Sequence, residues 1–318
     1  MNETFLKKYK PKLFDDFIID NEYISLLKSL IKMDTLNILL IGNSSCGKSS
    51  LLEAIIREYY SLNKIPKDNV LFINNLQEQG ISYYRTEVKT FCQTPSSVTG
   101  KKKFIVLDDI DTINEQSQQV FRNCIDKYSH NVNFISSCCN TQKVVESIQS
   151  RTILIKLKAP SKDILNKVLN KIKTNEKLDI TQSAQQFILN ICNNSIRLLI
   201  NYMEKFNLLD EKITIKKAKE ICTNISFFDL EKYTQEWAIN KDFKKAIKII
   251  NNIYEKGYSV MDILDSYFQF IKITNILDQK TKYDTTIIIC KYISLFHTLH
   301  ENEIELIFLT YDLIKNIL

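Results

Sequence analysis

The pattern of apolar and polar positions divides the 318-residue chain into three regions. In the first region, short apolar runs rich in β-branched residues alternate with segments whose apolar positions recur every three or four residues. Such alternation predicts parallel strands that are connected by helices. The predicted strands cover 37–41, 70–73, 104–107, 132–136 and 153–157. The expected fold class is therefore α/β, with a parallel sheet between layers of helices.

After Ala159-Pro160-Ser161 the strand pattern stops and only helical spacing follows. The first helical group covers 163–173, 181–192, 195–208 and 215–222, and the second includes 241–254, 260–277 and 303–317. We therefore predict three domains: an α/β domain over 1–159, a small helical domain over 160–225, and a second all-helical domain over 226–318.

The composition is that of an ordinary globular protein, with 44% hydrophobic and 25% charged residues. The net charge of +6 permits a nucleic-acid partner without requiring one. No apolar run approaches the roughly 18 to 20 residues of a membrane-spanning helix, and Met1 to Lys12 lack the apolar core of a secretion signal. We therefore expect an intracellular protein without a membrane partner. Its eight cysteines include no C-x-x-C pair, which favours reduced, mostly buried thiols.

The stretch Gly42-Asn43-Ser44-Ser45-Cys46-Gly47-Lys48-Ser49 matches the phosphate-loop pattern G-x-x-x-x-G-K-[ST]. It follows a predicted strand and precedes helical spacing over 48–60, as this motif requires. In such a loop the amide groups wrap the phosphates, Lys48 reaches the β and γ oxygens, and the Ser49 hydroxyl binds Mg²⁺. The predicted cofactors are ATP and Mg²⁺, and the predicted nucleotide-binding residues of the loop are Gly42, Cys46, Gly47, Lys48, Ser49 and Ser50.

A second motif is the apolar strand 104–107, which ends in Asp108 and Asp109 about sixty residues after the phosphate loop. This is a Walker B pattern. We expect Asp108 to hold Mg²⁺, directly or through water, and Asp109 to orient the water that attacks the γ-phosphate. Taken alone, the pattern also fits a strand that ends in a solvated acidic turn.

From these motifs outward, the sequence resembles the small subunits of replication factor C, a clamp loader and a branch of the AAA+ ATPases. Phe5 to Lys12 with Asp15-Asp16-Phe17 are similar to the family's W-x-E-K-Y-R-P-x-x-x-x-D-x opening. Further matches are 107–111 to L-D-E-A-D, 118–122 to Q-Q-A-L-R, 126–129 to E-K-Y-S, and 148–151 to the S-R-C segment. The resemblance is close over the first two thirds of the chain, and beyond that only helical composition supports it.

The resemblance implies roles for further residues. Tyr9 and Pro11 fall in the segment that lines the adenine pocket in the family. Arg151 would be an arginine finger, which acts in trans on a neighbouring subunit's nucleotide. Residues 194–201 are similar to G-D-M-R-x-A-L-N, so Arg197 would be the second sensor, which pulls a helical lid over the nucleotide. Alternatively, Arg151 could cap a strand and pair with a surface carboxylate. The alternative for Arg197 is an arginine on the solvated face of a helix.

The sequence also departs from the family pattern. Asp109 stands where the family has glutamate, and the carboxylate that is one methylene shorter implies slow or absent hydrolysis. Thr152 replaces the cysteine of the S-R-C segment. The first sensor, an asparagine in the family, aligns with Cys139 without a gap and with Asn140 after a one-residue shift. We include Asn140 among the predicted nucleotide-binding residues and leave this choice open.

For DNA, residues 74–85 resemble the family's N-A-S-D-x-R-G-I-x-x-V-R, where a helix begins that faces the central channel. Arg85 and Lys89 lie one turn apart and are predicted to contact duplex phosphates without reading sequence. A solvated helix face is the competing interpretation. Residues 101–103, three consecutive lysines, are predicted to form a solvated turn.

Together these features imply a clamp-loader small subunit that uses ATP to load a sliding clamp onto primer–template DNA during DNA replication. The expected partners are other clamp-loader subunits in a heteropentamer, the sliding clamp and DNA, in the nucleus or at a site of viral DNA replication. The domain 160–225 would then be the lid and 226–318 the oligomerising collar. Two alternatives remain: a nucleotide-binding scaffold subunit with weak or no hydrolysis, and another AAA+ replication protein such as an initiator or helicase loader.

Overall fold

The computed structural model describes residues 3–18, 21–62, 65–73, 81–209, 211–222, 225–296 and 299–317. The chain forms two compact units, Met1–Leu169 with Asn194–Asn201, and Asn170–Asn193 with Tyr202–Leu318. The division into three domains stays a prediction. Within the described residues, none of the helices combines the length and the apolar character that crossing a membrane requires.

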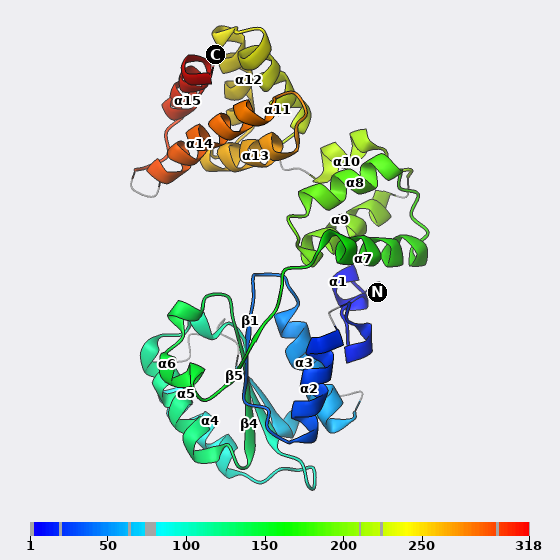
Figure 1. Cartoon of the computed structure of the whole chain (residues 1–318), viewed down its shortest axis with the longest axis vertical. Helices are drawn as coiled ribbons and strands as arrows, with labels where there is room; N and C mark the ends of the chain where they lie inside the picture. The colour runs from blue at the N-terminus through cyan, green and yellow to red at the C-terminus, as the bar shows by residue number, and fades with distance from the viewer. Residues whose placement is uncertain are drawn as a thin grey trace. The chain divides into compact units, whose positions relative to one another are not determined.

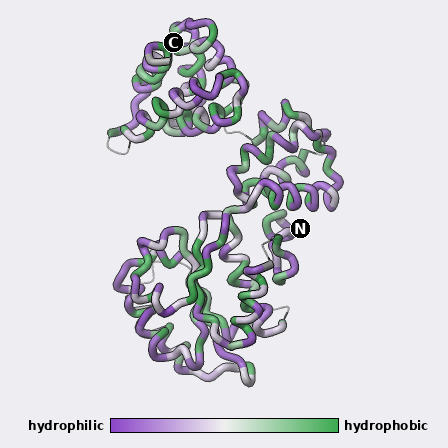
Figure 2. The backbone as a smooth tube through the Cα atoms, in the orientation of Figure 1, coloured by the Kyte–Doolittle hydropathy of each residue, from purple (hydrophilic) through white to green (hydrophobic). Residues whose placement is uncertain are grey.

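The first unit contains a five-stranded sheet in the order β2-β3-β4-β1-β5, with every neighbouring pair parallel. The strands are β1 (Ile38–Ile41), β2 (Val70–Ile73), β3 (Lys103–Leu107), β4 (Val132–Cys138) and β5 (Ile153–Lys156). The predicted α/β fold class and all five strands are thereby confirmed, with shifts of one or two residues at some ends. Figure 2 shows hydrophobic residues gathered along the middle of this sheet. The strands β1, β3 and β4 are buried throughout, as expected for strands that are covered on both faces, whereas the edge strand β5 is largely exposed.

Helices cover both faces of this sheet, with α2 and α3 on one side and α4, α5 and α6 on the other (Figure 1). The helices of this unit are α1 (Phe5–Lys8), α2 (Asn21–Lys32), α3 (Lys48–Tyr60), α4 (Ile81–Gln93), α5 (Glu115–Tyr128) and α6 (Glu146–Gln149), with short 3₁₀ turns η1 (Phe14–Asp16), η2 (Lys67–Asn69), η3 (Ile110–Thr112) and η4 (Thr141–Lys143). Side chains alternate along each strand, so Ile38 and Leu40 join one core while Leu39 and Ile41 join the other.

Helices make up the second unit, and two of them continue into it from the first. Its helices are α8 (Gln182–Ile191), α10 (Ile215–Cys222), α11 (Phe227–Thr234), the π-helical η5 (Gln235–Ile239), α12 (Phe243–Tyr254), α13 (Val260–Ile273), α14 (Gln279–Leu295) and α15 (Ile304–Ile317), together with the later parts of α7 (Lys162–Asn175) and α9 (Ile196–Leu209). A buried polar and aromatic cluster joins α13 to η5, because Trp237 Nε1 donates to Tyr267 Oη at 2.8 Å. The ring of Phe227 contacts those of Phe187 and Phe270, which links α8, α11 and α13.

The prediction of a solvated lysine turn at 101–103 was wrong for Lys103, which is only 4% exposed. Lys103 begins β3, and its Nζ donates to the Phe91 carbonyl at 3.0 Å and to Thr94 Oγ1 at 2.6 Å. The ammonium group therefore sits at the carboxyl end of α4, where unpaired carbonyls and the helix dipole favour a positive charge. Hydropathy alone gives no sign of such a partner.

Candidate nucleotide-binding site

The phosphate loop connects β1 to α3, so the amino end of α3 opens onto the carboxyl edge of the sheet. Gly47 precedes the helix with φ +94°, a left-handed conformation that glycine adopts at little cost. At Gly42, an added Cβ would lie 2.8 Å from Cys46 Sγ and 3.2 Å from the Leu157 carbonyl oxygen. The two motif glycines are thus required by backbone conformation at one position and by space at the other.

Lys48 is buried at the start of α3, and its ammonium group points back toward the loop. Its Nζ donates to the carbonyls of Gly42 at 2.9 Å and Asn43 at 3.1 Å, and to Cys139 Sγ at 3.2 Å. Burial opposes the charged form, but the hydrogen bond to Cys139 and the charges of Cys139, Cys46 and Asp109 outweigh it and raise the pKa of Lys48. The side chain therefore stays positively charged where phosphate oxygens would bind.

Asp108 and Asp109 follow the end of β3, next to Ser137 on the adjacent strand β4. Ser137 Oγ donates to Asp108 Oδ1 at 2.5 Å and accepts a hydrogen bond from the Asp109 amide at 3.1 Å. Asp109 has φ +52°, a left-handed conformation that aspartate tolerates better than most residues. Burial and the nearby charge of Asp108 raise the pKa of Asp109, against the opposing effects of Lys48 and Arg197.

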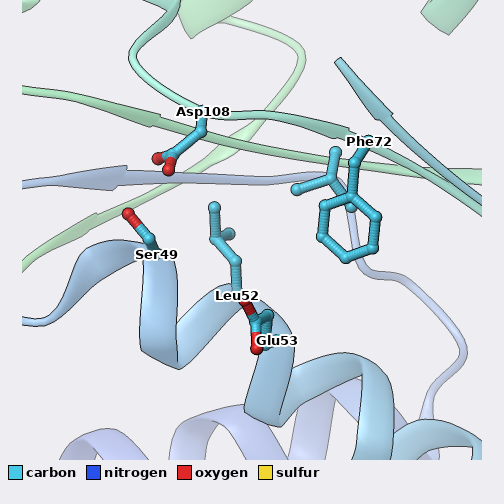
Figure 3. Close-up of a pocket in the computed structure, with 6 residues that line it drawn as sticks. Ser49, Leu52, Glu53, Phe72 and Asp108 are labelled. Carbon is cyan, nitrogen blue, oxygen red and sulfur yellow. The ribbon is translucent and has the colours of Figure 1, made fainter. Parts of the chain in front are cut away.

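Figure 3 shows the oxygens of Ser49 and Asp108 facing the same space. They line a cavity of about 330 Å³ whose other walls are Leu52, Glu53, Phe72 and Val106. A hydroxyl and a carboxylate are oxygen ligands of the kind that Mg²⁺ prefers. The residues present therefore fit the predicted magnesium ion.

Tyr9 and Pro11 are half-buried in a segment that is tied to α3. Lys10 Nζ pairs with Glu53 Oε1 at 2.6 Å, and the Phe14 amide donates to Glu58 Oε1 at 3.2 Å. These contacts fix the segment along the helix that begins at the phosphate loop. This placement is compatible with the predicted adenine pocket.

The two candidates for the first sensor have different environments. Cys139 contacts Lys48, whereas the Asn140 side chain accepts a hydrogen bond from the Gln142 amide and caps η4. Both backbone amides, of Cys139 and Asn140, donate to Asp111 Oδ2. Of the two residues, Cys139 is therefore the one that contacts Lys48, the lysine predicted to bind phosphate.

The two arginines of interest occupy different positions. Arg197 is exposed near the start of α9, within the first unit, and its charge lowers the pKa of Asp109. Arg151 follows α6, and Asp126, Ser147 and Ser150 accept its hydrogen bonds. None of these three partners belongs to the phosphate loop, and the action of Arg151 on a neighbouring subunit stays a prediction.

The predicted DNA-contacting residues belong to α4, where Lys89 is exposed. Arg85 is part of the same helix, but its side chain lies outside the described residues, as do residues 74–80 of the motif. The expectation that a helix begins within this motif is confirmed at Ile81.

Sequence reasoning missed three residues that organise the site. Ser137 carried no signal, because an isolated serine in a strand is common. Asp111 belongs to the L-D-E-A-D match, and its Oδ2 accepts hydrogen bonds from the amides of Cys139 and Asn140. Gln118 belongs to the Q-Q-A-L-R match and is 1% exposed; its Nε2 donates to the carbonyls of Ile110, Ile113 and Lys143, and its Oε1 accepts from the Val145 amide.

Comparison with known proteins agrees with this geometry. Residues 38–216 match the ATPase family associated with various cellular activities (AAA), and residues 232–293 match the replication factor C C-terminal domain. The chain therefore belongs to the AAA family of ATPases. Within that family it is similar to replication factor C small subunits, so the resemblance inferred from the motifs is confirmed.

Three relatives illustrate the similarity. The replication factor C small subunit of Picrophilus torridus is 29% identical over 83% of this chain and 82% of its own length. Replication factor C subunit 5 of Homo sapiens is 24% identical, over 85% and 79%. A relative from Acanthamoeba polyphaga mimivirus, which also carries the small-subunit name, is 27% identical over 85% and 83%.

Solved structures agree on the fold. The Thermotoga maritima RuvB Holliday junction branch migration motor aligns with a TM-score of 0.56 and 13% identity, over 87% of this chain and 97% of its own. Domain III of the Thermotoga maritima replication initiation protein DnaA aligns with a TM-score of 0.52 and 16% identity, over 66% and 95%.

Proposed function

We propose that this chain is a clamp-loader small subunit, which binds ATP with Mg²⁺ and hydrolyses it within a multi-subunit complex that places a sliding clamp on primer–template DNA. This proposal rests mainly on one observation: Lys48, Ser49, Asp108 and Asp109 lie close together around one loop. The chain that carries them is similar to replication factor C small subunits. The sliding clamp and the DNA are inferred from the resemblance to the family, whereas the geometry of the site supports nucleotide binding and hydrolysis.

The chain's own residues have separable tasks in this proposal. The loop amides and Lys48 bind the β and γ phosphates, and Ser49 and Asp108 hold the metal, which supplies charge neutralisation at the γ-phosphate. Asp109 orients the attacking water. Its raised pKa makes it a stronger base than an ordinary aspartate, which favours proton acceptance once the carboxyl group is ionised.

We propose that Arg151 acts on the nucleotide of a neighbouring subunit, so that hydrolysis depends on assembly. An arginine finger is worth about 10³ to 10⁵ in rate in well-studied cases. Other loader subunits are the proposed neighbours, in a five-membered complex. The collar helix α15 supports such contacts, because Ile304, Phe308 and Tyr311 are exposed at spacings of four and three residues.

Arg85 and Lys89 are the proposed DNA contacts, and the proposed location is the intracellular site of DNA replication. Lys89 is exposed on α4, so its ammonium group is accessible to a phosphate. Contacts of this kind fix orientation on a duplex and carry no sequence information, which suits a protein that recognises a primer junction by its shape.

The test is native mass spectrometry of the tagged chain, purified from its own source with ATP and Mg²⁺, followed by ATPase assays with primer–template DNA. We expect a five-subunit complex, hydrolysis that DNA stimulates, and loss of nucleotide binding in this subunit after Lys48→Ala. A monomer or a homohexamer would contradict the proposal and favour another AAA+ machine.

A second candidate is a scaffold subunit with little hydrolysis of its own, and two observations favour it. Asp109 carries a short side chain on a left-handed backbone, and a thiol from Cys139 takes the place beside Lys48. Asp109→Glu in the assembled complex separates the candidates, because a faster rate would indicate a catalytic but suboptimal site. Glutamate is strained at a left-handed position, so binding of a fluorescent ATP analogue must be shown to persist in this variant.

A further inference from the structure

The guanidinium group of Arg151 is fixed by its own subunit. Its Nε donates to Asp126 Oδ1 at 2.5 Å, and its Nη1 donates to the Ser147 carbonyl at 2.8 Å and to Ser150 Oγ at 3.4 Å. Within the described part of the chain Nη2 has no hydrogen bond, and 31% of the side chain is exposed. The contacts thus hold Nε and Nη1 of the guanidinium group and leave Nη2 available to a ligand.

Asp126 is itself well anchored. It lies near the end of α5, and its other oxygen, Oδ2, pairs with Arg122 Nη2 at 3.4 Å one turn earlier. The same helix buries Phe121, Cys124 and Ile125 in the core under the sheet. The carboxylate is therefore set by a packed helix and by a cation on each oxygen, and is not a surface charge that swings freely.

We propose that Asp126 is the positioning residue of the arginine finger, an inference that rests on the proposed function of Arg151. A free arginine side chain has many rotamers, and ordering it during the reaction carries an entropic cost. The ion pair with Asp126 lowers this cost, because it already orients the guanidinium group before the nucleotide of a neighbouring subunit binds. Such preorganisation accelerates a reaction only when the charge it aims at develops in the transition state.

The proposal predicts a specific pattern of kinetics in the assembled complex with primer–template DNA. Asp126→Ala should reproduce most of the loss in kcat that Arg151→Ala causes, about 10-fold or more at the site that Arg151 serves, because misplaced catalytic groups cost factors of this size. The KM for ATP should stay within about twofold, since ordinary binding contacts are untouched. Asp126→Glu, which retains the carboxylate, should recover part of the rate.

A double variant distinguishes positioning from general support of the fold. Asp126→Ala with Arg151→Ala should be no slower than Arg151→Ala alone, since Asp126 acts only through the arginine. Asp229→Ala in α11 is the matched control, because Asp229 forms a comparable ion pair with Lys256 at 2.7 Å and should leave kcat unchanged. Asp126→Asn, which is isosteric, replaces the alanine variant if native mass spectrometry shows that the latter fails to assemble.

The outcomes separate the two proposals. If Arg151→Ala slows hydrolysis and Asp126→Ala does not, or if Asp126→Ala speeds it, the positioning role is wrong and the finger remains. A double variant slower than Arg151→Ala also overturns it, since Asp126 would then have another task. If Arg151→Ala itself has no effect in an assembled complex, the proposed function of Arg151 fails first.

Discussion

Ser137 Oγ donates a 2.5 Å hydrogen bond to Asp108 Oδ1, and so positions, from the neighbouring strand, the carboxylate that is proposed to hold Mg²⁺. The same hydroxyl oxygen accepts a hydrogen bond from the Asp109 amide, so the hydroxyl proton of Ser137 points at Asp108. One buried serine thus positions both the carboxylate of Asp108 and the backbone amide of Asp109. Since Ser137 is fully buried, water cannot replace it without rearrangement.

The first prediction concerns this serine. Ser137→Ala removes the bond that orients Asp108 and should lower ATPase activity about tenfold, with a higher Mg²⁺ requirement, because metal-site geometry loosens. A magnesium titration of the assembled complex measures the effect. Ser136→Ala, one residue earlier and also buried, removes a bond to the Ile38 carbonyl and should leave the Mg²⁺ requirement unchanged. Equal effects of the two variants would contradict the orienting role.

The second prediction concerns stability and pH. The pKa of Asp109 is raised in the folded state, so its contribution to stability is full below the ordinary aspartate pKa and is lost as pH rises through the raised value. Asp109→Asn, which tolerates the left-handed backbone, should therefore raise the Tm near neutral pH while it removes hydrolysis. Thermal melts at about pH 7.5 and about pH 4.5 should show that this gain shrinks at the lower pH. A gain that is constant with pH would point to a cause other than charge.

The third prediction concerns the thiol beside Lys48. An amide oxygen accepts hydrogen bonds more strongly than a thiol sulfur, and an asparagine also offers a donor to the attacking water. Cys139→Asn should raise the hydrolysis rate of the assembled complex severalfold with little change in ATP affinity. Cys290→Asn, at the other exposed cysteine among the described residues, is the matched control. A slower Cys139→Asn enzyme would show that sulfur at this place is an adaptation.

The fourth prediction concerns Gln118, which joins η3, η4 and the start of α6 through four hydrogen bonds. Gln118→Leu has a similar volume but leaves the carbonyls of Ile113 and Lys143 and the amide of Val145 without their partner, and should cost about 3 to 5 kcal/mol of unfolding free energy. Chemical denaturation measures it. Gln119→Leu, at the exposed neighbour, should cost well under about 1 kcal/mol. A cost below that for Gln118→Leu would mean that water readily replaces the amide.

The fifth prediction concerns space in the phosphate loop. Gly42→Ala should weaken ATP binding at least about tenfold, because the new methyl group lies 2.8 Å from Cys46 Sγ and the loop must move. Adding Cys46→Ala removes that sulfur and should restore part of the affinity, although the Leu157 carbonyl remains close. Isothermal titration with ATP distinguishes a clash from a loss of backbone freedom, since the second change would give no rescue.

The sequence predicted the secondary structure around the site better than the side-chain hydrogen bonds within it. The strands follow from apolar runs, and the loop before α3 follows from residue types with strict backbone or charge requirements. The sequence therefore places Lys48 at the start of a helix and Asp108 after the end of a strand, as the structure does. The roles of Ser137 and Lys103 were not predicted, because they depend on partners that only the folded sheet brings near. Likewise, the sequence alone does not choose between Cys139 and Asn140 as the first sensor, and it does not show that Cys139 contacts Lys48.

The ring contacts of Phe227 with Phe187 and Phe270 bear on how the chain can be divided for study. All three rings are at least 94% shielded from water, and they come from α8, α11 and α13. A fragment that stops before Phe227 would leave the Phe187 ring facing solvent, which invites aggregation. For expression of separate pieces, the helices on either side of this aromatic contact are best kept on one polypeptide.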